Sequence, residues 1–131
     1  MDAIFEDLQA LENPLNGSRV NSTVVKELLS TSEARAPFLF ELRGDNGVML
    51  TVGLAGRVGV AQYASAVGLP PYLMALADDP SAELGFVEFL ARDTPTRILR
   101  RYCLAVERLE EVVGKFLEDG TRLEHVPWEE I

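Results

Sequence analysis

Hydrophobic residues recur with a helical period in two parts of the chain. In the later part they are spaced i, i+3, i+4, i+7 and i+8, which predicts a helix over residues 107–118 with one buried stripe. Gly120 follows the last periodic position, where a left-handed residue commonly ends a helix. The earlier part predicts a helix that Asn21 or Ser22 caps. The periodic residues are Leu109, Val112, Val113, Phe116 and Leu117 in the later part, and Val24, Val25, Leu28 and Leu29 in the earlier one.

The first residues also have helical spacing. Ile4, Phe5, Leu8 and Leu11 predict a short N-terminal helix. Asn13-Pro14 follows them, and this dipeptide has the chemistry of a turn. We therefore expect a helix of two to three turns before the capped one.

Alternation of apolar and polar residues predicts strands in the middle of the chain. Residues 38–43, 48–54 and 57–64 form three such runs, and Asn46-Gly47 between the first two is a strong hairpin signal. Two more strands are expected at residues 84–90 and 98–106. The sequence thus predicts a single α+β domain over residues 1–131, with an antiparallel sheet of about five strands and helices packed mainly on one face.

Residues 65–82 have no clear period. Gly68 and Pro70-Pro71 interrupt the segment, and Asp78-Asp79-Pro80 predicts a turn. We expect either a long ordered loop or a single helical turn, with Tyr72 and its apolar neighbours exposed. A loop of this length inside a compact domain is often functional.

The net charge of the chain indicates which kinds of partner it can bind. The 131 residues carry a net charge of −9, so binding to a nucleic-acid backbone or to an anionic membrane is disfavoured. A basic partner is favoured, although acidity also serves solubility alone. The first eleven residues include Asp2, Glu6 and Asp7 where a signal peptide would be basic, and no apolar run is long enough to cross a bilayer. The cytoplasm is the expected compartment.

Candidate chemistry is sparse. His125 has no nucleophile motif beside it, and His125 with Cys103 is a poor metal set, so neither a catalytic site nor a cofactor is expected. Cys103 is expected to be a buried small hydrophobe. Gly53, Gly56 and Gly59 lie within a hairpin, which does not fit a dinucleotide-binding loop. The sequence indicates a binding protein, while a small enzyme with an unrecognised site and a scaffold or oligomerisation module remain alternatives.

The end of the chain resembles a known family. A short strand with Cys103, the helix, and a close with Gly120, Arg122, Val126, Trp128 and Glu129 are similar to the C-terminus of bacterial immunity proteins of polymorphic toxin systems, which typically accompany deaminase-superfamily toxins. The family often has Pro after the basic residue, where this chain has Leu123.

The resemblance implies a non-enzymatic antitoxin in the cytoplasm that binds a basic cognate toxin and covers its active site. Deaminase toxins use a zinc-activated water, so that zinc would belong to the partner. The five matching residues would be mainly structural, with Trp128 anchoring the tail. The toxin-binding residues expected in the irregular segment and just after it are Tyr72, Asp78, Asp79 and Glu83.

Overall fold

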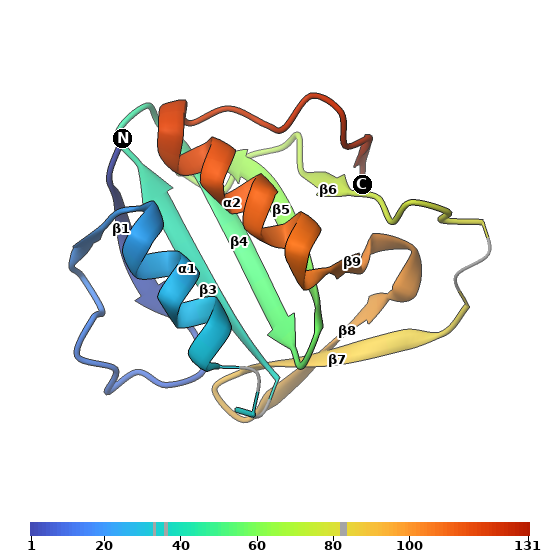
Figure 1. The fold of residues 1–131 in the computed structure, drawn as a ribbon, viewed down its shortest axis with the longest axis horizontal. Helices are drawn as coiled ribbons and strands as arrows, with labels where there is room; N and C mark the ends of the chain where they lie inside the picture. The colour runs from blue at the N-terminus through green and yellow to red at the C-terminus, as the bar shows by residue number, and fades with distance from the viewer. Residues whose placement is uncertain (33, 36, 82–83) are drawn as a thin grey trace.

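The computed structural model describes residues 1–32, 34–35, 37–81 and 84–131. Within these residues, strands form one largely antiparallel sheet in the order β10-β6-β5-β4-β3-β1-β2, and both helices pack on one of its faces (Figure 1). The α+β prediction with helices on one face is confirmed, but the sheet has ten strands where about five were expected. The elements are β1 (Ala3–Asp7), β2 (Arg19–Val20), α1 (Ser22–Thr31), β3 (Phe38–Gly44), β4 (Val48–Ala55), β5 (Val58–Ser65), β6 (Leu73–Ala75), β7 (Phe86–Ala91), β8 (Thr94–Leu99), the 3₁₀ turn η1 (Arg100–Tyr102), β9 (Leu104–Ala105), α2 (Val106–Asp119) and β10 (Trp128–Glu130).

The central meander of β3, β4 and β5 is confirmed. Gly47 and Gly56 take left-handed conformations in its two turns, with φ of 79° and 63°. On β3, Phe38, Phe40 and Leu42 are fully buried beneath the helices, and the residues between them face the opposite side of the sheet, which we call the open face.

Both strongly periodic helices are also confirmed. The Asn21 side chain accepts a hydrogen bond from the Val24 N–H at 3.0 Å and so caps α1. Gly120 has φ of 76° and donates its N–H to the Phe116 carbonyl at 2.7 Å, which ends α2. The buried stripe of α2 packs on β4 and β5 and joins the main core.

The predicted N-terminal helix is wrong, because this segment is the strand β1. Ala3, Phe5 and Asp7 are buried on the helix side, while Ile4 is only partly buried on the open face. β1 pairs with β3 from Ala3 opposite Gly44 to Asp7 opposite Phe40. Pairing with β3 gives the backbone N–H and C=O groups of this segment hydrogen-bond partners, whereas an isolated helix of this length is only marginally stable in water.

Three further segments have a different secondary structure from the one that the sequence suggests. Residues 65–82 contain a strand, β6, because β5 and β10 pair with it on either side. Thr94-Pro95-Thr96 has the composition of a turn, but these residues belong to β8, and the chain turns earlier, at Arg92 and Asp93, where Arg92 has φ of 55°. The expected strand at 98–106 is divided between β8, η1 and the two-residue β9.

The β7–β8 hairpin partly covers the open face. β7 touches the main sheet through a parallel bridge between Leu90 and Phe38, and β8 pairs with β7. Phe89, which is fully buried, packs against Leu39, Val60 and Met74 in a second, smaller core. The hairpin therefore stands over one part of the open face and leaves the rest uncovered.

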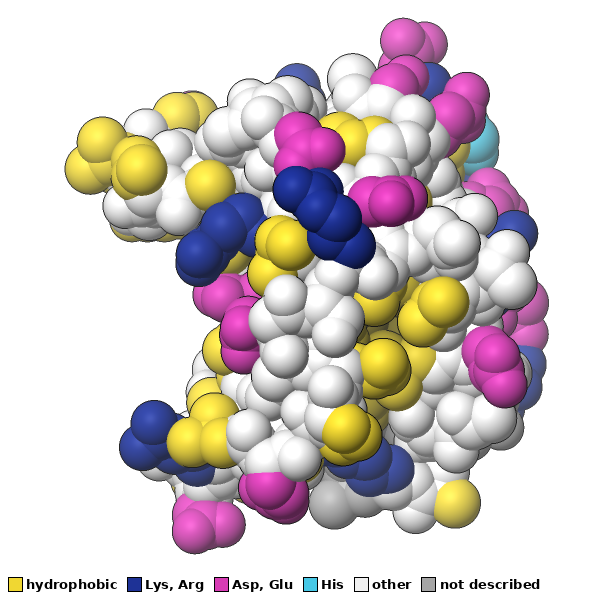
Figure 2. Space-filling model, turned by 90° about the vertical axis from the view of Figure 1, so that its left-hand side faces the viewer, with side chains coloured by type: hydrophobic (Ala, Val, Ile, Leu, Met, Phe, Trp, Pro, Cys, Tyr) yellow, Lys and Arg dark blue, Asp and Glu magenta, His cyan; other side chains and the backbone are white. Residues whose placement is uncertain are grey.

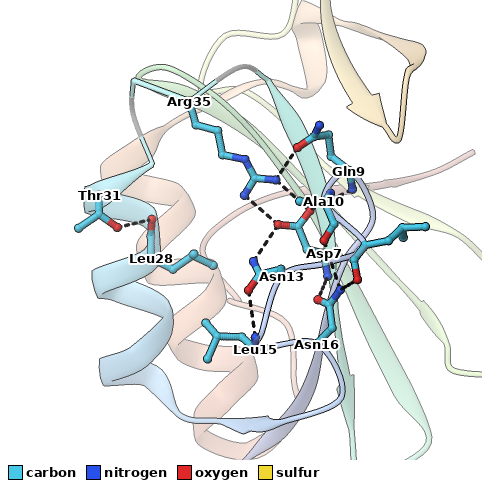
Figure 3. Close-up of polar contacts among 10 residues, drawn as sticks. Asp7, Gln9, Ala10, Asn13, Leu15, Asn16, Leu28, Thr31 and Arg35 are labelled. Carbon is cyan, nitrogen blue, oxygen red and sulfur yellow. Dashed lines mark hydrogen bonds and ion pairs between the residues drawn. The ribbon is translucent and has the colours of Figure 1, made fainter.

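A buried carboxylate organises the loop after β1. Asp7 is 0% exposed and accepts hydrogen bonds from the N–H groups of Gln9 and Ala10 and from the Asn13 side chain, at 2.8 to 3.0 Å (Figure 3). The Arg35 guanidinium contacts both oxygens of Asp7, at 3.0 Å and 2.8 Å, and also stacks on the Phe38 ring. Asp7 thus ties together β1, the following loop and the end of the α1 region.

The same contacts set the protonation of Asp7. Burial raises the pKa of Asp7, but the hydrogen bonds from Arg35, Ala10 and Asn13, together with the charge of Arg35, lower it by more. The pKa therefore lies below its ordinary value of 3.8, and the carboxylate stays ionised inside the protein.

We predict that Asp7→Asn lowers the free energy of unfolding by about 3 kcal/mol, because it leaves the Arg35 charge without its carboxylate. Asp45→Asn is the matched control. Asp45 pairs with Arg19 at 3.1 Å, but both side chains are 59% exposed, and such pairs contribute less than about 1 kcal/mol. Urea unfolding measures both variants, and equal losses would show that Asp7 is not the stronger contact.

The difference between wild type and Asp7→Asn is also expected to depend on pH. Since the folded pKa of Asp7 is depressed, its contribution is present in full above the unfolded value of about 3.9 and is lost as pH falls through the folded pKa. Unfolding curves taken from neutral pH into the acid range should therefore converge for the two proteins. A constant difference across that range would contradict this linkage.

Candidate functional site

Three of the residues that carry the C-terminal resemblance, Gly120, Arg122 and Trp128, lie around Tyr63 of β5. The Tyr63 hydroxyl donates to the Gly120 carbonyl at 2.9 Å, and the same carbonyl accepts from the Asn46 side chain at 3.2 Å. The Arg122 guanidinium lies 5.7 Å from the Tyr63 ring centre and 6.0 Å from that of Trp128. These contacts fix the turn after α2 to the meander.

Trp128 and Val126 hold the tail that follows. Val126 is 4% exposed and belongs to the main core, whereas Trp128 is half-buried. The Trp128 indole N–H donates to the Leu123 carbonyl at 3.2 Å, and its ring meets Tyr63 edge-on at 6.3 Å between centroids. The expectation that the tail packs back on the body is confirmed.

Glu129 lies on the other side of the same strand. It accepts hydrogen bonds from Arg101 at 2.6 Å and from the Tyr102 hydroxyl at 2.7 Å. The hydrogen bond to the Glu129 carboxylate raises the pKa of Tyr102. Glu129 therefore anchors the η1 turn, which connects the hairpin to α2.

Part of the expected binding segment is core instead. Met74 of β6 is 4% exposed, so the expectation that it is exposed is wrong. Tyr72 is half-buried at the start of β6, and its hydroxyl donates to the Gly68 carbonyl. β6 is held between β5 and β10, and this pairing directs Met74 into the second core.

Asp78 and Asp79 are exposed, but they do have basic neighbours. They line a cavity of about 340 Å³ that Arg100, Arg108 and the half-buried Cys103 also line. Asp78 lies 3.9 Å from Arg108, and Asp79 accepts a hydrogen bond from Ser81 at 3.0 Å. Arg108 is distant from Asp78 in the sequence but close to it in the fold, so Asp78 has a basic neighbour. Glu83, the fourth expected contact, lies outside the described residues.

Arg108 connects Asp78 to the acids of α2. It lies 3.3 Å from Glu111, which is also 3.3 Å from His125. The exposed acids on the outer side of α2 recur at i, i+4 and i+11, so they share one side of the helix. We name the resulting patch the acidic surface. Its members are Asp78, Asp79, Glu107, Glu111 and Glu118. Figure 2, which views the molecule from the side away from the segment after β6, shows other acidic side chains along its right-hand edge.

The hairpin region has the opposite balance. Residues 84–103 contain Arg92, Arg97, Arg100 and Arg101 but only two acids, Glu88 and Asp93. Because the whole chain has a net charge of −9, the excess of acid lies outside this region. The two regions meet where Arg100 lines the same cavity as Asp78 and Asp79.

No group of three or more acidic, histidine or cysteine residues in the described part of the chain is placed to hold a metal ion. Among the same residues, no helix is long and apolar enough to cross a membrane. No model of a known protein family matches the sequence, and no curated protein matches it either.

For the tail, we predict that Trp128→Ala lowers the free energy of unfolding by about 3 kcal/mol, the low end for a large aromatic because Trp128 is half-buried. Trp128→Phe keeps a ring against Tyr63 and loses the hydrogen bond to Leu123, so it should cost only about 1 kcal/mol. Thermal unfolding measures both. Unchanged stability in Trp128→Ala would show that the residue does not anchor the tail.

Proposed function

We propose that this protein is an antitoxin, a non-enzymatic immunity protein of a bacterial polymorphic toxin system. It binds a basic toxin that deaminates nucleic acid and covers the toxin's active site. The observation that carries this proposal is the acidic surface, where Arg108 brings Asp78 beside the acids of α2.

Charge complementarity supports a basic partner. An enzyme that acts on nucleic acid carries a basic surface to hold the phosphate backbone. A protein inhibitor that presents carboxylates to that surface competes with the substrate and associates quickly, because opposite fields steer the encounter. Asp78, Glu107 and Glu111 are exposed, and each lies in an ion pair with Arg57 or Arg108 of this chain that a basic partner would have to share.

The resemblance of the C-terminal residues to bacterial immunity proteins supports the same proposal independently of the charge. Gly120, Arg122, Val126 and Trp128 contact one another or the body of the protein, which fits a motif that maintains the fold. The toxin contacts are then expected beyond the motif, at the acidic surface and at Tyr72. The proposed inhibition needs no cofactor from this chain, since any catalytic zinc belongs to the toxin.

The direct test uses the protein encoded by the neighbouring reading frame. Its C-terminal domain, purified and mixed with this chain, should form a stable complex and lose deaminase activity on a nucleic-acid substrate. Growth of cells that express the domain should be restored by co-expression of this chain. Full deaminase activity in the presence of excess chain would contradict the proposed function.

The acidic surface has its own test. We predict that the double variant Asp78→Lys, Glu111→Lys slows association with the toxin domain by about tenfold or more at low salt and reduces the salt dependence of the rate. The control is Glu12→Lys, Asp93→Lys, which makes the same change in net charge at two exposed positions outside the acidic surface.

Melting temperatures of both double variants establish that they are folded. Equal association rates for the two would exclude the acidic surface as the interface. Tyr72→Ala would then be the next variant to measure, and a contact there should mainly raise the dissociation rate.

A further inference from the structure

A groove of about 370 Å³ runs along β8 on the open face. Its floor includes the apolar Leu39, Val60 and Met74, and its wall is formed by residues 96–99 of β8. Ile131, which is 58% exposed, closes one end. Figure 2 shows the molecule hollowed on the side opposite the helices, at the left of the view.

The wall of this groove is the free edge of a strand. In an antiparallel pair, hydrogen-bonded and non-hydrogen-bonded positions alternate. The Arg100 N–H donates to the Gly85 carbonyl at 3.0 Å, so the next pair, Phe86 with Leu99, is non-hydrogen-bonded. By the same alternation the N–H groups of Leu99 and Arg97 point away from β7.

The structure gives neither of these two N–H groups an acceptor among the residues it describes. Pro95 is also at a position whose N–H would point away from β7, so the absence of its N–H removes no hydrogen bond to β7. β8 thus presents unpaired main-chain donors beside an apolar groove. That combination is what an added strand needs, because main-chain hydrogen bonds give affinity and side-chain pockets give specificity.

Charge indicates what kind of strand fits. The Arg97 guanidinium lies 4.3 Å from the centre of the Phe86 ring. Glu88 of β7 stands opposite Arg97 within the hairpin, but among the described residues no carboxylate lies within ion-pair distance of Arg97, and its other side faces the open edge. The hairpin region also has an excess of arginine over acid. A second copy of β8 would place arginine close to arginine, which is destabilising across strands. An acidic residue opposite Arg97 is favoured instead.

We propose that the groove and the edge of β8 bind an extended segment of a partner protein by strand addition. Alternate apolar side chains of that segment enter the groove above Val60 and Met74, and an Asp or Glu lies beside Arg97. The groove shares no lining residue with the acidic surface, so its test is separate from that of the proposed antitoxin function.

Synthetic peptides test the ligand class. A set of blocked heptapeptides with alternating Val, Ile or Phe, and with Asp, Glu, Asn or Lys at the centre, is titrated into the whole chain and followed by fluorescence polarisation. Peptides with Asp or Glu should bind at least about tenfold more tightly than those with Lys, a difference typical of one favourable charge contact. Methylation of the peptide amides on one edge should abolish binding. Lack of saturable binding by every peptide would overturn the proposal.

Two variants at one position test the edge itself. Leu99 has φ of −60° and ψ of 138°, a conformation that proline adopts without strain. Leu99→Pro removes the outward N–H, whereas Leu99→Ala keeps it and also shortens the side chain. We predict that Leu99→Pro binds the acidic peptides about tenfold more weakly than Leu99→Ala, as loss of a main-chain hydrogen bond predicts.

Thermal unfolding confirms that both variants are folded. Equal affinities of the two variants would overturn strand addition at β8. Sedimentation of the wild-type chain and of Leu99→Pro tests whether a second copy of the chain occupies the groove. A wild-type dimer that Leu99→Pro dissociates would overturn the proposed partner.

Discussion

The rest of the structure depends on one steric constraint: α2 and the β7–β8 hairpin both pack closely against the centre of the β3–β4–β5 meander, from opposite faces. Gly59 faces α2, and a Cβ atom there would meet Leu109 and the carbonyl of Gly53. Gly53 faces the open side, and a Cβ atom there would lie 2.8 Å from the Phe89 ring. Glycine on neighbouring strands thus lets the helix and the hairpin pack on opposite sides of the same part of the sheet.

This arrangement separates two surfaces of different chemistry. α2 carries the acids that Arg108 joins to Asp78 on the helix side. The hairpin that Phe89 fixes supplies one wall of an apolar groove on the open side, and this wall includes Arg97. The two sites share no residue, although Leu99 and Tyr102 of the groove are next in sequence to Arg100 and Cys103, which line the cavity of Asp78 and Asp79.

The C-terminal tail connects the two sides. Trp128 packs toward Tyr63 on the helix side, while its neighbour Glu129 binds Arg101 and Tyr102 on the other. Tyr102 lines the groove at the base of the hairpin. Side chains alternate across a strand, so consecutive residues of one short strand secure both the end of α2 and the end of β8.

Local patterns by themselves determined the elements whose signals lie within a few residues. The α2 stripe with Gly120, the Asn21 cap and the Asn46-Gly47 hairpin are of this kind, since each depends on neighbouring positions. Tertiary pairing decided the rest. The N-terminal apolar residues suit a helix until β3 offers them a partner, and β6 is a strand because β5 and β10 flank it.

The candidate sites divide in the same way. The acidity of the chain and the residues of the C-terminal motif could be read from the sequence, but the proximity of Asp78 to Arg108 could not. The edge of β8 was also missed, because the sequence does not show that residues 94–97 continue the strand and pair with β7. Short-range periodicity specifies which face of a segment is apolar, whereas the fold alone specifies which distant segment covers that face and which edge remains unpaired.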